Sequence, residues 1–262
     1  MNINCITSGL VEKLNFGAVN FSKRNAVRPI LLERQYASDC FTKSVTDKFE
    51  TETQPDKLYL MIKTLIEALN DKNPYTCNHS KRVGLYGLLF AKTLDIPDDR
   101  LEEVETAAIL HDIGKILVPN NIICKEGKLN FEEYDIIKSH SLGSKTLLQN
   151  HPEFNEILYA VKHHHERWDG KGYPDGLQEE DIPYLSRIIA IVDSYDAMTS
   201  ARPYRDGLPH EQAITEIERY SGAQFDPELA KRFLEAQNLI RDAKNHPNTY
   251  FEEHSILYNK IK

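Results

Sequence analysis

The sequence has few cysteines and no long hydrophobic run, and both absences limit what the chain can be. Its 262 residues include four cysteines, which stand far apart and form no metal-binding pair. Such sparse cysteine usage is typical of a reducing compartment. No apolar stretch reaches the about 18 residues of a transmembrane helix, and the N-terminus lacks the basic and apolar segments of a secretory signal. We therefore expect a soluble, cytoplasmic protein without a membrane span.

Positive charge is also scarce. Lysine and arginine total 32 against 40 aspartates and glutamates, which gives a net charge of −8 at pH 7. Proteins that bind along duplex nucleic acid need many cations facing phosphates, so this balance argues against duplex binding. A small phosphorylated ligand is compatible with it, because one site can be locally basic in an acidic protein.

Strand-like alternation is missing over any useful length, whereas helical periodicity recurs from about residue 55. Asp226 followed by Pro227, for example, is typical of a helix start, with a capping side chain and proline in the first turn. We predict helices at about 55–69, 75–94, 98–110, 131–149, 153–167, 183–200, 209–220 and 226–237, with loops at 120–130 and 168–176. The expected fold class is an all-α helical bundle.

The two ends of the chain lack this periodicity. Residues 1–53 mix short apolar pieces with polar runs, and we expect a poorly ordered arm or the remnant of a regulatory module. Residues 54–242 form the predicted helical domain. The remaining residues, 243–262, are mostly polar, and we expect them to be a peripheral tail.

A His–Asp pair, His111 and Asp112, closes an apolar run in AAILHDIGK. Alone, this pair is explained by a capped helix end and a hydrogen-bonded core histidine. Asp193 is harder to explain in that way, because it lies within IIAIVDSYDAM, whose apolar residues predict burial. Buried carboxylates rarely lack a partner, so Asp193 indicates a polar site in the core.

Further histidines fall on other predicted helices. His79 and His140 could each be surface residues, and the run from His163 to His165 could be a polar helix end. Together, however, five helices that each supply a histidine or aspartate are typical of a metal site in a bundle core. Imidazole and carboxylate ligands favour iron, manganese or zinc. A carboxylate shared by two ions would give a binuclear centre suited to in-line attack at phosphorus.

Three cations could serve a phosphate group. Lys115 follows His111 by one helical turn and so projects from the same face. Arg202 and Arg205 follow the helix of Asp193 in SARPYRDG. Arginine can grip phosphate with two hydrogen bonds, and lysine acts as a point charge. The alternative is that these residues are ordinary surface charges.

Three segments together resemble the HD-GYP family of the HD phosphohydrolase superfamily. They are HDIGK at 111–115, HHERWDGKGYPDGL at 164–177 and IVDSYDAMTSARPYR at 191–205. The resemblance covers about residues 55–240. It implies a helical bundle with two or three metal ions, commonly iron or manganese, and an enzyme that hydrolyses cyclic di-GMP.

The resemblance also implies roles for individual residues. The implied metal ligands are His111, Asp112, His140, His164, His165 and Asp193, with Asp112 bridging two ions. His163 is then an extra residue with a structural role. Lys115, Arg202 and Arg205 match phosphate-contacting positions, and Tyr173 belongs to a loop beside the substrate groove. The implied catalytic residues are His111, Asp112 and Lys115.

His79 bears on the number of metals. It matches a histidine that is a ligand in three-metal members, and those members carry an acidic ligand one helical turn earlier. Here that position is Tyr75, which cannot replace a carboxylate. We therefore expect two divalent ions, iron or manganese with zinc as an alternative, and a less central part for His79.

The resemblance predicts a metal-dependent phosphodiesterase that opens cyclic di-GMP to linear pGpG, with a second cut to GMP left open. Two alternatives stand beside it: an HD phosphohydrolase acting on another nucleotide, and a non-catalytic cyclic dinucleotide sensor or docking module. Whether the chain forms a homodimer is open. The GYP loop could also present a docking surface to a diguanylate cyclase.

Overall fold

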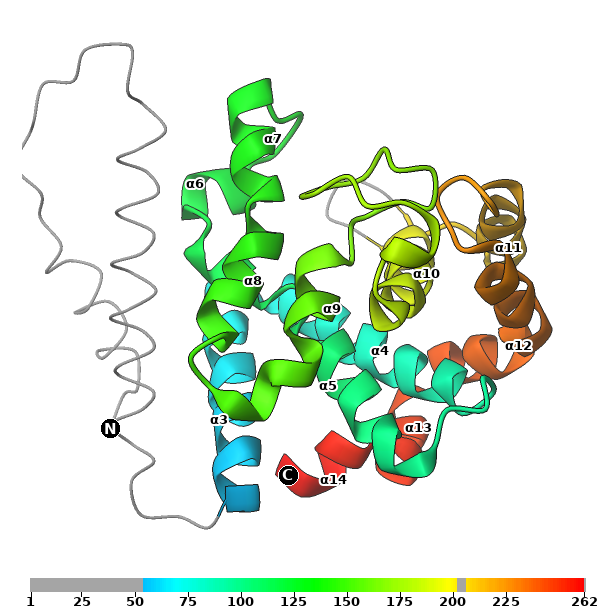
Figure 1. Cartoon of the computed structure of the whole chain (residues 1–262), viewed down its shortest axis with the longest axis horizontal. Helices are drawn as coiled ribbons and strands as arrows, with labels where there is room; N and C mark the ends of the chain where they lie inside the picture. Colours follow the sequence, from blue (N-terminus) through cyan, green and yellow to red (C-terminus); the bar gives the residue numbers. More distant parts are fainter. Residues whose placement is uncertain (1–53, 202–205, 262) are drawn as a thin grey trace, which may run out of the picture.

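A computed structural model describes residues 54–201 and 206–261, and over these ranges the chain is a bundle of helices (Figure 1). The arm at residues 1–53, Arg202 and Arg205 lie outside the described residues. The helices are α3 (Gln54–Lys72), α4 (Pro74–Ala91), α5 (Leu101–Leu110), α6 (Asn120–Ile123), α7 (Phe131–Lys138), α8 (His140–Leu148), α9 (Leu158–His163), α10 (Tyr184–Thr199), α11 (His210–Arg219), α12 (Pro227–Asn245), α13 (Pro247–His254) and α14 (Ile256–Ile261). Short 3-10 turns include η2 (Ile113–Leu117) and η3 (Pro152–Ile157).

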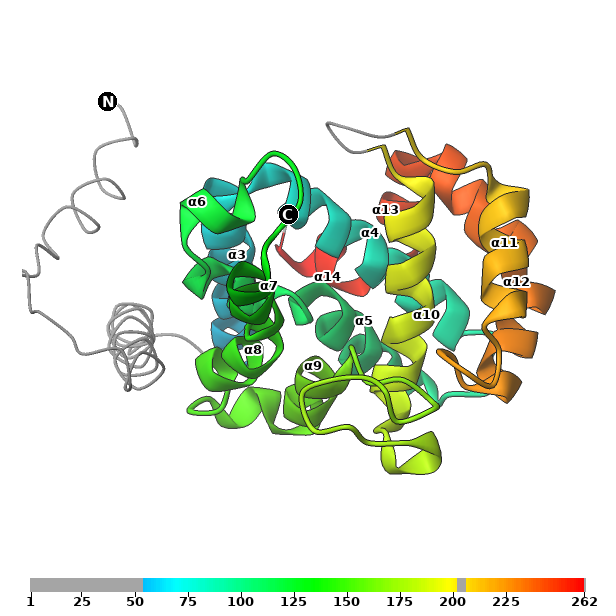
Figure 2. The same ribbon diagram turned by 90° about the horizontal axis from the view of Figure 1, so that it is seen from above.

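The centre of the bundle is α4, which packs against α3, α5, α10, α12 and α13. Two glycines of α4 allow the close approach of α5. A Cβ at Gly84 would lie 2.3 Å from Ile109 Cγ1, and one at Gly87 would lie 3.1 Å from Ala108 Cβ. Helix α10 lies along α4, and α11 and α12 cover its outer side (Figure 2). This packing brings α4, α5 and α10 together around one interior region.

The all-α prediction is confirmed, and several predicted boundaries change. The predicted helix at 153–167 is a 3-10 turn followed by α9, which ends at His163, and the helix predicted at 226–237 extends to Asn245. The predicted helix at 131–149 is two helices that meet at Ser139, whose hydroxyl donates to the Ile136 carbonyl. Such local bonds compete with helix continuation. The predicted loop at 120–130 begins with the short helix α6. Among the described residues, no helix has the length and apolar character needed to cross a membrane.

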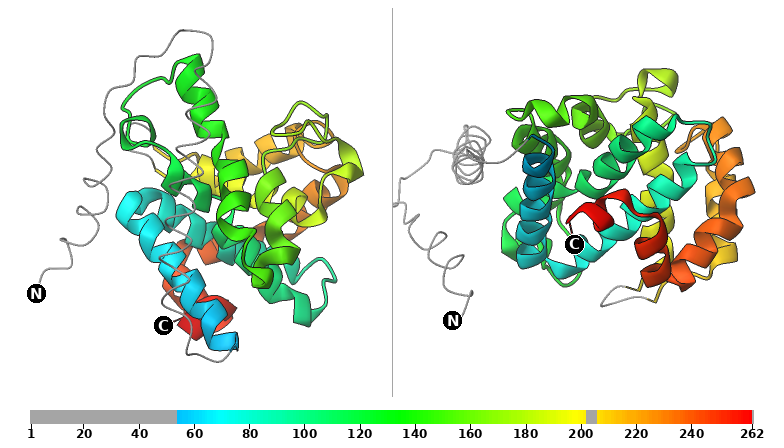
Figure 3. Two further views of the ribbon diagram at one scale, coloured as in Figure 1. Left: turned by 60° about the vertical axis from the view of Figure 1, so that its left-hand side comes forward. Right: turned by 90° about the horizontal axis from the view of Figure 1, so that it is seen from below.

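The C-terminal segment differs from the expected peripheral tail. Helices α13 and α14 pack against α3, α4 and α5, as the red ribbon in Figure 3 shows, and Leu257 is fully buried. The anchor is Glu105, a buried carboxylate on α5. It accepts hydrogen bonds from the Ser255 hydroxyl and from the backbone N–H groups of Ile256 and Leu257, the latter two at 2.9 and 3.0 Å. The expectation was wrong because this anchor lies 150 residues earlier in the chain.

Replacing Glu105 by alanine should lower the free energy of unfolding by about 2–3 kcal/mol, because buried donors of α14 lose their acceptor. Chemical denaturation measures this loss. Glu102→Ala is the matched control, since Glu102 also joins α5 to α14, through an exposed ion pair with Lys260 at 2.7 Å. Exposed pairs contribute at most about 1 kcal/mol. Equal losses in the two variants would contradict the anchoring role of Glu105.

Candidate metal centre

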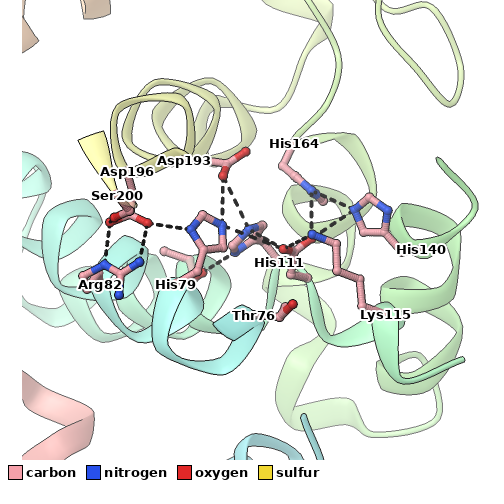
Figure 4. A network of polar contacts seen from close by, with 12 residues as sticks. Thr76, His79, Arg82, His111, Lys115, His140, His164, Asp193, Asp196 and Ser200 are labelled. Atoms are coloured by element: carbon pink, nitrogen blue, oxygen red, sulfur yellow. Dashed lines mark hydrogen bonds and ion pairs between the residues drawn. The ribbon is translucent and has the colours of Figure 1, made fainter. Parts of the chain in front are cut away.

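Seven histidine and aspartate side chains converge in the interior of the bundle, in two groups. Figure 4 labels five of them, His79, His111, His140, His164 and Asp193. The Asp112 group comprises Asp112, His140, His164 and His165. The Asp193 group comprises His79, His111 and Asp193. Within each group, one potential ligand atom per residue lies within 4.8 Å of all the others. These groups bring together every residue that the sequence predicted as a ligand, His79 included.

Asp112 faces both groups. Its Oδ1 lies 3.1 Å from His140 Nε2 and 4.0 Å from His164 Nε2. Its Oδ2 lies 3.4 Å from His111 Nε2 and 3.8 Å from His79 Nε2. One carboxylate therefore offers a different oxygen to each group, as a ligand shared between two cations would.

Backbone carbonyls fix which nitrogen each imidazole presents to the centre. His111 Nδ1 lies 2.7 Å from the Ala108 carbonyl, His140 Nδ1 2.6 Å from Ile137, and His164 Nδ1 2.8 Å from Val161. A carbonyl can only accept, so Nδ1 must carry the hydrogen and the neutral ring keeps its Nε2 lone pair free. These rings are therefore oriented as metal ligands would be.

The electrostatics of the Asp112 group also suit a cation. Burial and the neighbouring imidazoles lower the pKa of His164 and of His165, the latter to about 3. Burial alone would raise the pKa of Asp112, but Lys115 and His111 hold it well below its usual range. The buried atoms His111 Nε2 and Asp112 Oδ1 have no hydrogen-bond partner among the described residues. Neutral imidazoles beside an ionised carboxylate are the forms that bind divalent metals.

A buried ion pair supports His79 from behind, and the sequence did not reveal it. Asp196 is fully buried on α10, and its Oδ2 lies 2.7 Å from His79 Nδ1. Arg82 donates to both oxygens of this carboxylate, at 2.6 and 2.8 Å, and Ser200 donates at 3.1 Å. His79 Nε2 then points at Asp193 Oδ1, 3.0 Å away. Spacing in the sequence could have indicated these two residues, because Asp196 follows Asp193 by three residues and Arg82 follows His79 by three residues.

The carboxylates of Asp193 and Asp196 outweigh the effect of burial on the pKa of His79. Burial lowers the pKa of its imidazole, but hydrogen bonds to Asp193 and Asp196 raise it to about 9. In the absence of a metal, a proton therefore lies between His79 Nε2 and Asp193. A divalent ion at that position would take the place of the proton.

The GYP segment folds back against the end of α9. Glu166 is buried, and its Oε1 accepts the backbone N–H groups of Asp175 and Gly176 at 2.7 and 3.1 Å. A Cβ at Gly172 would lie 2.4 Å from Glu166 Cα, so only glycine fits there. This fold brings the Tyr173 ring to 4.8 Å from the His165 ring. Glu166 was also missed as a site residue, although it follows the paired histidines directly.

Two other predicted residues occupy distinct positions. Lys115 Nζ lies 2.5 Å from Asp112 Oδ2, at the junction of the two groups. His163 belongs to neither group, and its Nε2 lies 2.9 Å from Asp175 Oδ2, where it supports the GYP segment. The position of Arg202 and Arg205 relative to the centre lies outside the described residues.

Comparison with known proteins agrees with this geometry. The profile of the HD domain matches residues 63–229, which is more than half of the chain. The chain belongs to the HD-GYP family.

Among curated relatives of this HD-GYP protein is a cyclic di-GMP phosphodiesterase of Thermotoga maritima, 37% identical over 198 residues, which are 75% of this chain and 54% of the relative. Cyclic di-GMP phosphodiesterase PA4108 of Pseudomonas aeruginosa is 35% identical over 203 residues, 74% of this chain and 49% of that one. A 3'3'-cGAMP-specific phosphodiesterase of Vibrio cholerae is 37% identical over 171 residues, 65% and 37% respectively. The chain spans about half the length, or less, of these relatives.

Two solved structures share the fold. The cyclic GMP-AMP-specific phosphodiesterase V-cGAP3 of V. cholerae aligns with a TM-score of 0.51 at 16% identity, over 77% of this chain and 52% of that one. Bd1817 of Bdellovibrio bacteriovorus aligns with a TM-score of 0.53 at 18% identity, over 82% of this chain and 67% of that one. At these identities the likeness concerns the fold alone.

Replacing Asp196 by asparagine should weaken metal binding about 10- to 100-fold, because the ring of His79 loses its charged partner and Arg82 loses its counter-ion. Titration with Mn²⁺ measures this affinity, with circular dichroism as a check on the fold. Ser200→Ala removes a single contact to the same carboxylate and should change the affinity little. Wild-type affinity in Asp196→Asn would refute the supporting role.

Replacing Gly114 by alanine should reduce stability by about 1–3 kcal/mol and lower the metal content, because the new Cβ would lie 2.0 Å from the His140 carbonyl and 2.4 Å from Ser144 N. The α8 ligand must then move away from Asp112. Gly143→Ala is the control at the same contact, since its Cβ would meet neighbours at an ordinary 3.4 Å. Denaturation and metal analysis compare the two, and equal behaviour would contradict this explanation of Gly114.

Proposed function

We propose that this chain is a metal-dependent phosphodiesterase that hydrolyses cyclic di-GMP to linear pGpG. The observation that supports this proposal most strongly is the position of Asp112. Its two oxygens face two separate ligand groups, and Lys115 lies beside it. Two cations bridged by a carboxylate, next to a lysine, form a site suited to phosphodiester hydrolysis.

The residues that would hold the metals follow from the two groups. The Asp112 group would hold one ion, the Asp193 group would hold the other, and Asp112 would be shared. Iron or manganese suits this set of imidazoles and carboxylates, and zinc is the alternative. Two bound divalent ions polarise phosphoryl oxygens and make water a nucleophile near neutral pH.

The protein's own cations would act on the phosphate. The Lys115 ammonium has three donors, so it can hold Asp112 and still donate to a phosphoryl oxygen. A charge fixed in this way stabilises negative charge as it develops on the phosphate. Arg202 and Arg205 would grip the same group from the segment after α10, as the family resemblance implies. Tyr173, held by the GYP segment beside His165, would line the entrance.

A second substrate is supported by a specific observation. The V. cholerae relative named as a 3'3'-cGAMP-specific phosphodiesterase is as similar to this chain, at 37% identity, as the T. maritima cyclic di-GMP enzyme. Both substrates contain a guanine nucleotide and the same phosphodiester linkage. The proposed activity therefore extends to cyclic GMP-AMP, with cyclic di-GMP as the main candidate.

The test is turnover by the metal-loaded chain with a panel of cyclic di-GMP, cyclic GMP-AMP, cyclic di-AMP and nucleoside triphosphates. We expect linear pGpG from cyclic di-GMP, and a loss of at least about 100-fold in Asp112→Asn, because the shared ligand is weakened. Asp71→Asn, at an exposed position of α3, is the control and should keep wild-type activity.

Each other outcome identifies a different function. Tight binding of cyclic di-GMP without turnover, with iron, manganese and zinc each tried, would indicate a sensor. Turnover of triphosphates alone would indicate another HD phosphohydrolase. Full activity in the double variant His111→Ala with Asp112→Ala would refute the metal-hydrolase mechanism.

A further inference from the structure

None of the residues of helix α7 is buried, and its exposed residues include two large aromatic side chains. The helix stands out beyond α8 at one end of the molecule (Figure 1). Phe131 is 91% exposed and Tyr134 is 49% exposed. Aromatic side chains left in water beside a candidate active site call for a physical explanation, since burying such a ring is favourable.

A row of side chains connects α7 to the metal centre. The His165 ring of the Asp112 group lies 4.8 Å from the Tyr173 ring. Lys138 Nζ lies 6.0 Å from the centroid of that tyrosine and 5.1 Å from the centroid of Tyr134. From the centre outward the order is imidazole, phenol ring, ammonium and an exposed phenol ring.

The ammonium at the middle of this row is easily available to a ligand. Its ion partner is Asp135, three residues earlier on the same helix, at 2.7 Å, and the Asp135 side chain is 70% exposed. Such exposed pairs within a helix contribute little to stability, so diverting Lys138 to a ligand costs little. Its N–H groups can only donate, which selects a partner rich in acceptors.

We propose that Tyr134 and Lys138 bind the guanine base of the nucleotide whose phosphate lies at the metal centre, with the base on the Tyr134 ring and Lys138 at its O6 and N7. This inference rests on the proposed function. Only a ribose separates base from phosphate, so the base falls among the side chains next to the centre, where this row lies.

The chemistry of the two purines makes Lys138 a specificity residue. Guanine presents two acceptors, O6 and N7, on the edge where adenine presents N7 and an amino donor. An ammonium can therefore donate to both acceptors of guanine, whereas it offers no acceptor to the amino group of adenine. The exposed ring of Tyr134 stacks on either base, because every base has a π face. Tyr134 thus supplies affinity, and Lys138 supplies the preference for guanine.

Steady-state kinetics of Lys138→Met and Tyr134→Ala test the proposal. For Lys138→Met we expect KM for cyclic di-GMP to rise about tenfold, and the preference for cyclic di-GMP over cyclic di-AMP to fall by a similar factor. For Tyr134→Ala we expect KM to rise about tenfold for both substrates. Tyr134→Phe, which keeps the ring, should restore the wild-type value.

Two controls separate base binding from damage to the centre. Mn²⁺ affinity, measured by titration, should be unchanged in Lys138→Met and Tyr134→Ala, because neither residue belongs to the two candidate metal groups. Lys145→Met is the matched lysine variant, because Lys145 lies over the Tyr159 ring at 4.9 Å in a similar pair between α8 and α9. This variant should keep the wild-type purine preference.

The inference is overturned if Lys138→Met keeps the wild-type KM and purine preference, or if its Mn²⁺ affinity falls as much as its cyclic di-GMP hydrolysis. Calorimetric binding of pGpG and pApA to wild type and Lys138→Met separates this failure from failure of the proposed function. One possible result is that no cyclic dinucleotide is hydrolysed, while wild type binds pGpG more tightly than pApA and Lys138→Met does not. That result would support the base site and contradict the hydrolase proposal. Equal binding of pGpG and pApA by wild type overturns the base site itself.

Discussion

The centre of this structure depends on a buried carboxylate, Asp112, that imidazoles surround on two sides. A buried charge of this kind is costly unless it has compensating partners. Here Lys115 compensates part of the charge, and His111 and His140 turn their Nε2 atoms inward because backbone carbonyls accept from their Nδ1 atoms. The result is a cluster of electron-pair donors in the core, whose full compensation requires cations. Helices α4, α5, α8, α9 and α10 each carry one of these donors or end directly before one.

Much of this centre was predictable from the sequence. His111, Asp112 and Asp193 stand in apolar surroundings, where a polar side chain signals a site, and the histidines recur on separate helices. The family resemblance then joined them into one ligand set, and the structure brings the whole set together. Helix positions followed from periodicity, with errors where Ser139 divides one predicted helix into two and where the helix predicted at 153–167 begins as a 3-10 turn and ends at His163.

The supporting interactions were not predictable in the same way. Arg82 and Asp196 are 114 residues apart in the chain, and each alone reads as an ordinary charged residue near a helix surface. Glu105 and Ser255 are 150 residues apart, and the tail that they anchor has a polar composition. Periodicity reports which face of a helix is apolar, but it does not report which distant partner a polar residue meets. Such pairings depend on the tertiary packing.

The helix boundaries around the site have an electrostatic consequence. Helices α5, α7 and α9 end at Leu110, Lys138 and His163, immediately or one residue before the ligands His111, His140 and His164. The carboxyl end of a helix carries a partial negative charge, of about half an elementary charge in a long helix. The ends of α5 and α9 lie beside one residue of each group, whereas the end of α7 is offset by the start of α8 at His140. The backbone at the first two ends favours cations over phosphate. If the chain acts on a cyclic dinucleotide as proposed, the metals would have to reverse the sign of the local potential before the anionic substrate binds, which would give metal and substrate an order of binding.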